Sequence, residues 1–238
     1  MDETRKFDSM PVLASPADLQ DGVARLSRGA FFREASLEMV LSILTESAAR
    51  MSGIERVSIW ALTADQHELC CLELFELSAS RHNGGERVMA SHCPAYFEAL
   101  RRESCIVADD AWRHPATAEF AGGYLARHEI TAVLDTPIHI RGEFQGVLSL
   151  EQVGTREPWN ATHRLFAHAV ANLVTLALVE HEAAQARQQA ETASERLQKL
   201  FGNLVPAERR ACLAQFSSGT MRMAPQGHSA AQTPQPLQ

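Results

Sequence analysis

The chain has 238 residues, of which 45% are hydrophobic and 21% are charged, so it can build a substantial core in one or two domains. A formal charge of −7, with lysines and arginines scattered along the chain, argues against a nucleic-acid-binding role. Because we find no secretory signal, no apolar run near the ~18 residues that span a bilayer and no CxxC pair among five cysteines, we expect a cytoplasmic protein that binds no membrane.

The first half of the chain is predicted to contain helices and strands in alternation. Residues 1–30 form a turn-rich N-terminal extension. A helix is predicted from Phe31 to Met51, because Leu37, Val40 and Leu44 recur at helical spacing, and it ends near Gly53. Strands follow over 55–62 and 68–77, and a polar loop occupies 78–87. A short helix over 94–103 and a strand over 105–109 come next.

The second half contains a hairpin between two helices. A helix over 115–129, weakened by Gly122 and Gly123, precedes strands over 131–140 and 145–154. The order is helix, two strands, helix, strand, helix, two strands and a long helix. Paired strands interrupted by helices indicate an α+β fold with an antiparallel sheet, not a doubly wound one.

The register of this hairpin decides which polar residues share a face. A two-residue turn at 142–143 would pair Thr136 with Ser149. This register places Thr136, Ser149 and Glu151 on one face of the sheet and Asp135 and His139 on the other. Either set could line the floor of a pocket, and a shift of one residue exchanges the two faces.

The last helix, over about 160–204, has the period of a coiled coil. Apolar and small residues alternate at spacings of four and three, which is the 3.5-residue repeat of a left-handed supercoil. Residues 183–204 are predicted as a coiled-coil signalling helix, Gly202-Asn203 as a break, 205–216 as a short helix and 217–238 as a disordered tail. The predicted seam consists of Leu165, Ala169, Asn172, Leu176, Val179, Ala183, Ala186, Ala190, Ala193, Leu197, Leu200 and Leu204.

The stretch "IVADDAWRHPATAEF" (106–120) has the composition of a functional site. Asp109, Asp110, Trp112 and His114 follow an apolar strand directly. Capping of a turn by one of the acids is the first interpretation, ligand contact the second and acid–base catalysis by His114 a distant third. Catalysis also needs a nucleophile, and no G-x-S-x-G or strong Cys/His pattern supplies one.

Several segments in order resemble the GAF domain family, of the type associated with bacterial sensor kinases and cyclases. They are "RVSIWAL", "ELCCLELFEL", "YFEALRRESCIVADDAWRHPATAEF", "YLARHEITAVLDTPIHIRGEFQGVLSLEQVG" and "PWNATHRLFAHAVANLVTLAL". The resemblance implies that residues 31–182 form an antiparallel sheet with terminal helices on one face and a roofed pocket on the other.

The resemblance also implies a role and a site. It implies a non-catalytic sensory module that binds an unidentified small molecule, forms a homodimer through helices 31–52 and 160–204, and acts on an output-domain partner. The residues that we expect to contact the ligand are Trp60, Phe75, Tyr96, Asp109, Asp110, Trp112, His114, Phe120, Tyr124, Asp135, Ser149 and Glu151.

Two alternatives stay open on the same fold. One is a thiol-dependent reductase similar to the free-methionine-sulfoxide reductases, which would use cysteines such as Cys93 and Cys105. The other is a ligand-free dimerisation scaffold whose pocket is filled by aromatic side chains. No cofactor is expected: no histidine is singled out for haem, the cysteine motif for a bilin is missing, and so is the cyclic-nucleotide pattern.

Overall fold

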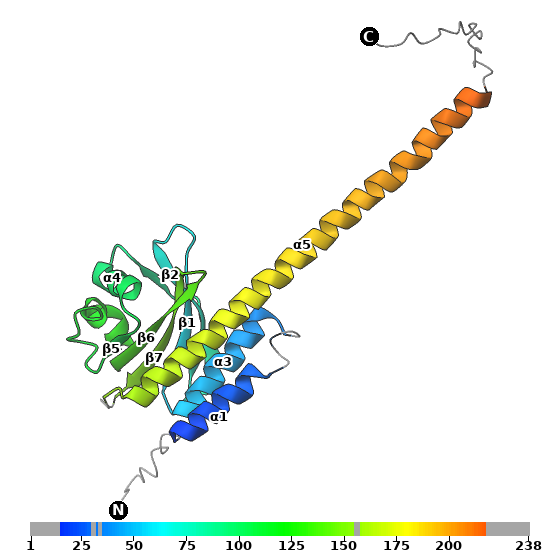
Figure 1. Ribbon diagram of the computed structural model, residues 1–238. Coiled ribbons are helices and arrows are strands. Elements are labelled where there is room, and N and C mark those ends of the chain that lie inside the picture. Colours follow the sequence, from blue (N-terminus) through cyan, green and yellow to red (C-terminus); the bar gives the residue numbers. More distant parts are fainter. Residues whose placement is uncertain (1–14, 30–31, 33–34, 155–157, 218–238) are drawn as a thin grey trace, which may run out of the picture. The chain divides into compact units, whose positions relative to one another are not determined.

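The structure is a computed structural model that describes residues 15–29, 32, 35–154 and 158–217. One antiparallel sheet lies between two layers of helices (Figure 1). Helices α1 (Pro16–Ser27), α3 (Leu37–Ser52) and the first part of α5 (Ala161–Ser217) lie on one face, and α4 (Pro94–Arg102) lies on the other. The predicted α+β architecture is confirmed.

The strands follow the order β3-β2-β1-β7-β6-β5, and β4 also pairs with β2. Every pairing is antiparallel. The pairing of β1 with β7 brings the first and last long strands together in the middle of the sheet. The strands are β1 (Arg56–Leu62), β2 (Glu68–Glu76), β3 (Arg81–Asn83), β4 (Arg87–Met89), β5 (Ile106–Ala108), β6 (Ile130–Ile140) and β7 (Glu143–Val153).

The alternation of side chains along the central strands produces two separate apolar layers. On β1, Val57 and Ile59 belong to the core under α3 and α5, whereas Trp60 belongs to the core under α4. Ser36 caps the start of α3 through a hydrogen bond from the Met39 amide, and Gly53 ends it with a left-handed φ of 70°. The sheet therefore has two faces: the helix face, covered by α1, α3 and the first part of α5, and the α4 face on the opposite side.

Three segments differ from the predictions made from the sequence. Residues 16–27, predicted as part of an irregular extension, form α1, which is capped by Ser15 and packs Gly22 against Met51 of α3. Strands β3 and β4 occupy the segment predicted as a polar loop. The helix predicted over 115–129 is replaced by a 3₁₀ turn, η1 (Ala118–Phe120), and a π-helical turn, η2 (Ala121–Leu125).

The predicted hairpin register is wrong by one residue. The turn is formed by Arg141 and Gly142, whose φ values of 55° and 83° are those of a type I′ turn, so that Ile140 faces Glu143. A bulge next to Ile138 then shifts the pairing again, and Asp135 lies opposite Ser149. Asp135 therefore shares a face with Ser149 and Glu151, and Thr136 lies on the helix face.

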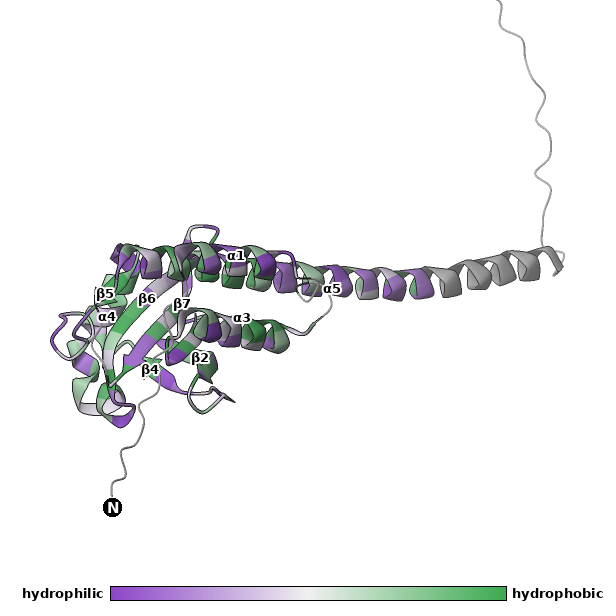
Figure 2. Cartoon of the chain, turned by 90° about the horizontal axis from the view of Figure 1, so that it is seen from below, coloured by the Kyte–Doolittle hydropathy of each residue, from purple (hydrophilic) through white to green (hydrophobic). Residues whose placement is uncertain are grey.

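Helix α5 has 57 residues and continues through Gly202 and Asn203, where a break was predicted. The chain divides at this helix into two units, residues 1–184 and 185–238. Polar residues predominate in α5 between residues 185 and 200 (Figure 2). The stretch 161–200 is long and apolar enough to pass a compositional test for a membrane span, but 44% of its most apolar window is buried within the fold.

Candidate ligand pocket

A small cavity lies between the α4 face of the sheet and a roof formed by residues 117–125. Its free volume is about 30 Å³, which accommodates one or two water molecules. Aromatic rings form much of its wall. The Tyr96 ring packs edge to face against Phe120 of the roof at a centroid distance of 4.9 Å, and the Trp60 ring packs in the same way against Tyr124 of the roof at 6.2 Å. The lining residues are Trp60, Leu69, Val88, Tyr96, Thr117, Phe120, Tyr124, Leu125, Val133, Asp135, Ser149 and Glu151.

The carboxylate of Asp135 is the most unusual group in this cavity. The side chain is 2% exposed, and its Oδ2 accepts a 2.6 Å hydrogen bond from the Tyr96 hydroxyl. Its Oδ1 is buried without a hydrogen-bond partner. Burial raises the pKa of Asp135 to about 7, although the Ser149 and Tyr96 hydroxyls oppose the shift. An acceptor that faces a cavity and lacks a donor is suited to a ligand that supplies one.

The raised pKa of Asp135 predicts how stability depends on pH. Between an ordinary pKa near 4 and the folded value of about 7, the folded chain binds the proton more tightly than the unfolded chain. The free energy of unfolding should therefore fall, by roughly 4 kcal/mol, as the pH rises through this range. Chemical denaturation of wild type and Asp135→Asn across this pH range measures the contribution of Asp135 as the difference between the two free energies of unfolding. If the free energies of the two proteins changed with pH in parallel, the prediction would be contradicted.

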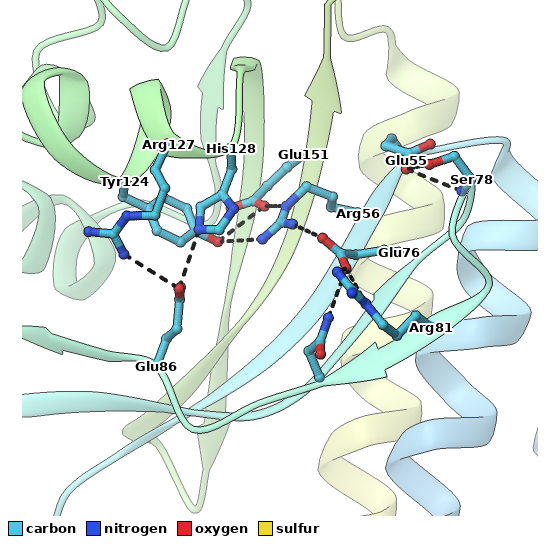
Figure 3. Close-up of polar contacts among 11 residues, drawn as sticks. Glu55, Arg56, Glu76, Ser78, Arg81, Glu86, Tyr124, Arg127, His128 and Glu151 are labelled. Carbon is cyan, nitrogen blue, oxygen red and sulfur yellow. Dashed lines mark hydrogen bonds and ion pairs between the residues drawn. The ribbon is translucent and has the colours of Figure 1, made fainter.

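Beside the cavity, the buried guanidinium of Arg56 joins three strands to the roof (Figure 3). Its Nε donates to Glu151 at 2.9 Å, one terminal nitrogen donates to Glu76 at 2.5 Å, and the other donates to the Tyr124 hydroxyl at 3.3 Å. Tyr124 also donates to Glu151 at 3.2 Å. Burial lowers the pKa of Arg56, but the charge of Glu151 and the interactions with Glu151 and Tyr124 together outweigh it, so the net pKa is raised and Arg56 stays protonated.

An outer group of charges continues from this cluster toward the surface. Glu76 also accepts from Arg81 at 2.7 Å. Just after the roof, His128 and Arg127 lie 3.3 and 3.7 Å from Glu86 (Figure 3). Tyr124 therefore attaches the roof to the sheet, and Glu86, in the loop before β4, contacts the residues that follow the roof.

The structure brings together seven of the twelve predicted site residues. They are Trp60, Tyr96, Phe120, Tyr124, Asp135, Ser149 and Glu151. The other five lie outside the cavity. Phe75 points to the helix face, where its ring contacts His82 at 4.8 Å and the Arg50 guanidinium at 5.3 Å.

The Asp109–His114 stretch is a structural turn rather than the rim of the cavity. Asp109 accepts a 2.7 Å hydrogen bond from the Trp159 amide just before α5, and Asp110 accepts one from the Trp112 amide. The Trp112 indole donates to the Ile130 carbonyl, and His114 accepts from the backbone two residues later. Capping, the first interpretation of the acids, matches these bonds, and ligand contact by the four residues does not.

Sequence reasoning missed Thr117 and the apolar lining from Leu69, Val88, Leu125 and Val133, and it missed Arg56. An arginine at the start of a predicted strand, in a row with Ser58 and Trp60, was a signal for a buried charge on the pocket face. Thr117 is buried because its hydroxyl donates to the Ala111 carbonyl and closes the turn that leads into the roof. These positions depend on contacts distant in sequence.

Two buried thiols and the arrangement of metal-ligating groups bear on other kinds of chemistry. Burial raises the pKa of Cys71 to about 12 and that of Cys93 to about 11, so both stay protonated near neutral pH. Within the described ranges, no group of three or more His, Cys, Asp or Glu side chains is placed to hold a metal ion.

The antiparallel sheet between two layers of helices and the roofed cavity define the class of α+β domain, and comparison with known families identifies the family. The family model described as "GAF domain" matches residues 36–178, and the chain therefore belongs to the GAF domain family. A sequence comparison with characterised proteins gave no match.

Solved structures of GAF domains are similar to this chain in fold. A phycocyanobilin-bound GAF domain from a cyanobacterial phytochrome has a TM-score of 0.59 and 13% identity, covering 70% of this chain and 96% of the other. The GAF domain of an Acinetobacter phosphoenolpyruvate-protein phosphotransferase has a TM-score of 0.55 and 17% identity. The match covers 70% of this chain and 93% of the other. The free methionine-R-sulfoxide reductase of Neisseria meningitidis, solved with its substrate, has a TM-score of 0.54 and 12% identity. The match covers 74% of this chain and 97% of the other.

Proposed function

We propose that this chain is a non-catalytic sensory or regulatory GAF module that binds a small molecule in the cavity under residues 117–125. The observation that carries the proposal is the Asp135 carboxylate, which is buried in an aromatic-walled cavity with one oxygen unpaired. An unpaired buried acceptor costs about 1–3 kcal/mol, which a ligand with a matching donor would recover on binding.

The roof is built so that it can move to admit such a ligand. A free volume of about 30 Å³ is too small for a metabolite, so binding requires the roof to shift outward. The roof consists of a 3₁₀ turn and a π-helical turn and contains Gly122 and Gly123, instead of a regular α-helix. Its inner attachment to the sheet is mainly the hydroxyl of Tyr124, with bonds of 3.2 and 3.3 Å.

Native mass spectrometry of the protein purified under mild conditions tests the proposal. We expect a co-purifying small molecule on the wild type and its loss from Asp135→Leu. Glu98→Gln, which alters an exposed carboxylate on α4, is the matched control and should keep the molecule. A wild-type mass equal to that of the bare chain would instead favour the ligand-free scaffold, for which the near-filled cavity is the specific support.

The proposed output is a homodimer formed through α5 together with α3. Between residues 161 and 184, α5 carries two apolar faces. One, including Phe166, Val170 and Val174, is buried against the sheet. The other contains Leu165 and Leu176, which are 71% and 40% exposed and belong to the predicted seam. A second apolar stripe that the fold leaves in water favours a partner helix.

Sedimentation of the wild type over a range of concentrations tests this dimer. We expect a dimer that dissociates in Leu176→Glu/Val179→Glu, because two charges on the seam would face their counterparts across the helix pair. Leu72→Glu, at a similarly exposed position on β2, should leave the dimer intact. A wild type that remains a monomer at high concentration would contradict the proposal.

Asp109 offers a route from the pocket to this helix. Its carboxylate holds the backbone before α5, and its own segment leads through Thr117 into the roof. We propose that a shift of the roof reaches α5 through this bond. A ligand changes the helix only as far as it binds the two roof positions with different affinity.

A further inference from the structure

The charges around the cavity are arranged for a cation. Of the side chains that line it, two are acidic and none is basic. The nearby Arg56 is not available to a ligand anion, because its three nitrogens are used by Glu151, Glu76 and Tyr124. A ligand carboxylate or phosphate would therefore meet Asp135 and Glu151 without a compensating positive group.

The two acids are not equivalent. Glu151 is already paired with Arg56 at 2.9 Å and also accepts from Tyr124. Asp135 has no positive partner: its Oδ2 accepts from the Tyr96 hydroxyl, and its Oδ1 has no hydrogen-bond partner. The position left open is thus one carboxylate oxygen of a residue that lines the same cavity as the rings of Trp60, Tyr96, Phe120 and Tyr124.

A carboxylate beside several aromatic rings is the environment that a protonated amine prefers. The ammonium group donates a charge-assisted hydrogen bond to the carboxylate, and the ring faces attract its positive charge. We infer that the ligand of this pocket carries a protonated amine, which binds Asp135 Oδ1 among these rings. The inference rests on the proposed ligand-binding function and specifies the chemical class of the ligand.

The titration of Asp135 makes the inference testable by pH. The groups that face Asp135 are Tyr96 from α4, Ser149 and Glu151 from β7, and Tyr124 from the roof. Tyr96 and Tyr124 have pKa values raised by burial and stay neutral. Because the pKa of Asp135 is about 7, the ionised form that an ammonium needs becomes more populated as the pH rises. Amine affinity should rise over this range.

Three probes of the same shape and different charge separate the possibilities: benzylamine, benzyl alcohol and benzoate. Ligand-observed NMR titration of the full chain measures their dissociation constants. We expect benzylamine to bind about 10-fold more tightly than benzyl alcohol, as one charge-assisted hydrogen bond predicts, and benzoate to bind weakest. Asp135→Asn should remove the preference for the amine, whereas Glu98→Gln should keep it.

The wild type alone gives a second measurement that needs no variant to fold. Between about pH 5.5 and about pH 8, benzylamine stays protonated while Asp135 ionises, so its affinity should increase and that of benzyl alcohol should not. Equal affinities for the amine and the alcohol, or a preference for benzoate, would overturn the amine inference and leave a binding pocket in place. Absence of binding by all three also rejects it, whereas the proposed function is judged separately by native mass spectrometry.

Discussion

Replacing Arg56 with methionine is expected to lower the free energy of unfolding by about 3–5 kcal/mol. The guanidinium is 3% exposed and pairs with Glu151, which is equally buried. Methionine fills a similar volume but leaves the Glu151 carboxylate without a positive partner in the interior. It also removes one of the two groups that hold the Tyr124 hydroxyl of the roof. Equilibrium denaturation in urea measures the loss.

Two further variants show whether the buried charge is the cause. Arg81→Met removes an ion pair to Glu76 from a side chain that is 64% exposed, and should cost less than about 1 kcal/mol. Adding Glu151→Leu to Arg56→Met should recover much of the loss, because no unpaired carboxylate then remains at that position. If Arg56→Met cost no more than Arg81→Met, the assigned role of this cluster would be wrong.

Gly146→Ala is expected to cost roughly 3 kcal/mol, although it adds a single methyl group. Gly146 lies on β7 opposite Ala61 of β1, and a Cβ atom built there lies only 2.2 Å from the carbonyl oxygen of Trp60. That oxygen belongs to the backbone of a central strand, so the two strands would have to separate. Since Trp60 lines the cavity, the pocket should be perturbed as well.

The matched control is Gly122→Ala in the roof. A Cβ at Gly122 meets no atom within 4 Å, and the backbone there has no positive φ. The change should therefore alter stability by less than about 1 kcal/mol, and reduced entropy of the unfolded chain favours a small gain. Thermal and urea unfolding compare the two alanines directly. Similar effects at Gly122 and Gly146 would contradict the close strand approach as the reason.

The pocket and the turn at Asp109 have separate tasks in this structure. Asp109, Asp110, Trp112 and His114 are polar residues gathered in sequence, and their side chains serve backbone groups of the turn and of the residue before α5. The polar groups of the cavity come from widely separated strands and helices. A dense polar motif was therefore a weaker guide to the site than single acids in apolar strands.

The sequence by itself determined the fold class and the order of most elements. Alternating and helical hydrophobic patterns are local properties of the chain, and they placed α3, β1, β2, α4, β6, β7 and α5 within a few residues of their observed bounds, apart from the start of α3 and the C-terminal end of α5. The resemblance to GAF domains, rather than these patterns, gave Trp60, Tyr96, Phe120 and Tyr124 as expected pocket residues, and all four line the cavity. The predicted coiled coil of α5 stays a prediction.

Only the tertiary structure decided which polar residues face the cavity. The left-handed conformation of Arg141 sets the hairpin turn, and one bulge sets the final register, so Asp135 rather than Thr136 joins Ser149 and Glu151. The alternation of a strand has a period of two residues, and a shift of one residue therefore exchanges its faces. Arg56 meets Glu151 across 95 positions of sequence, a distance over which no local pattern carries information.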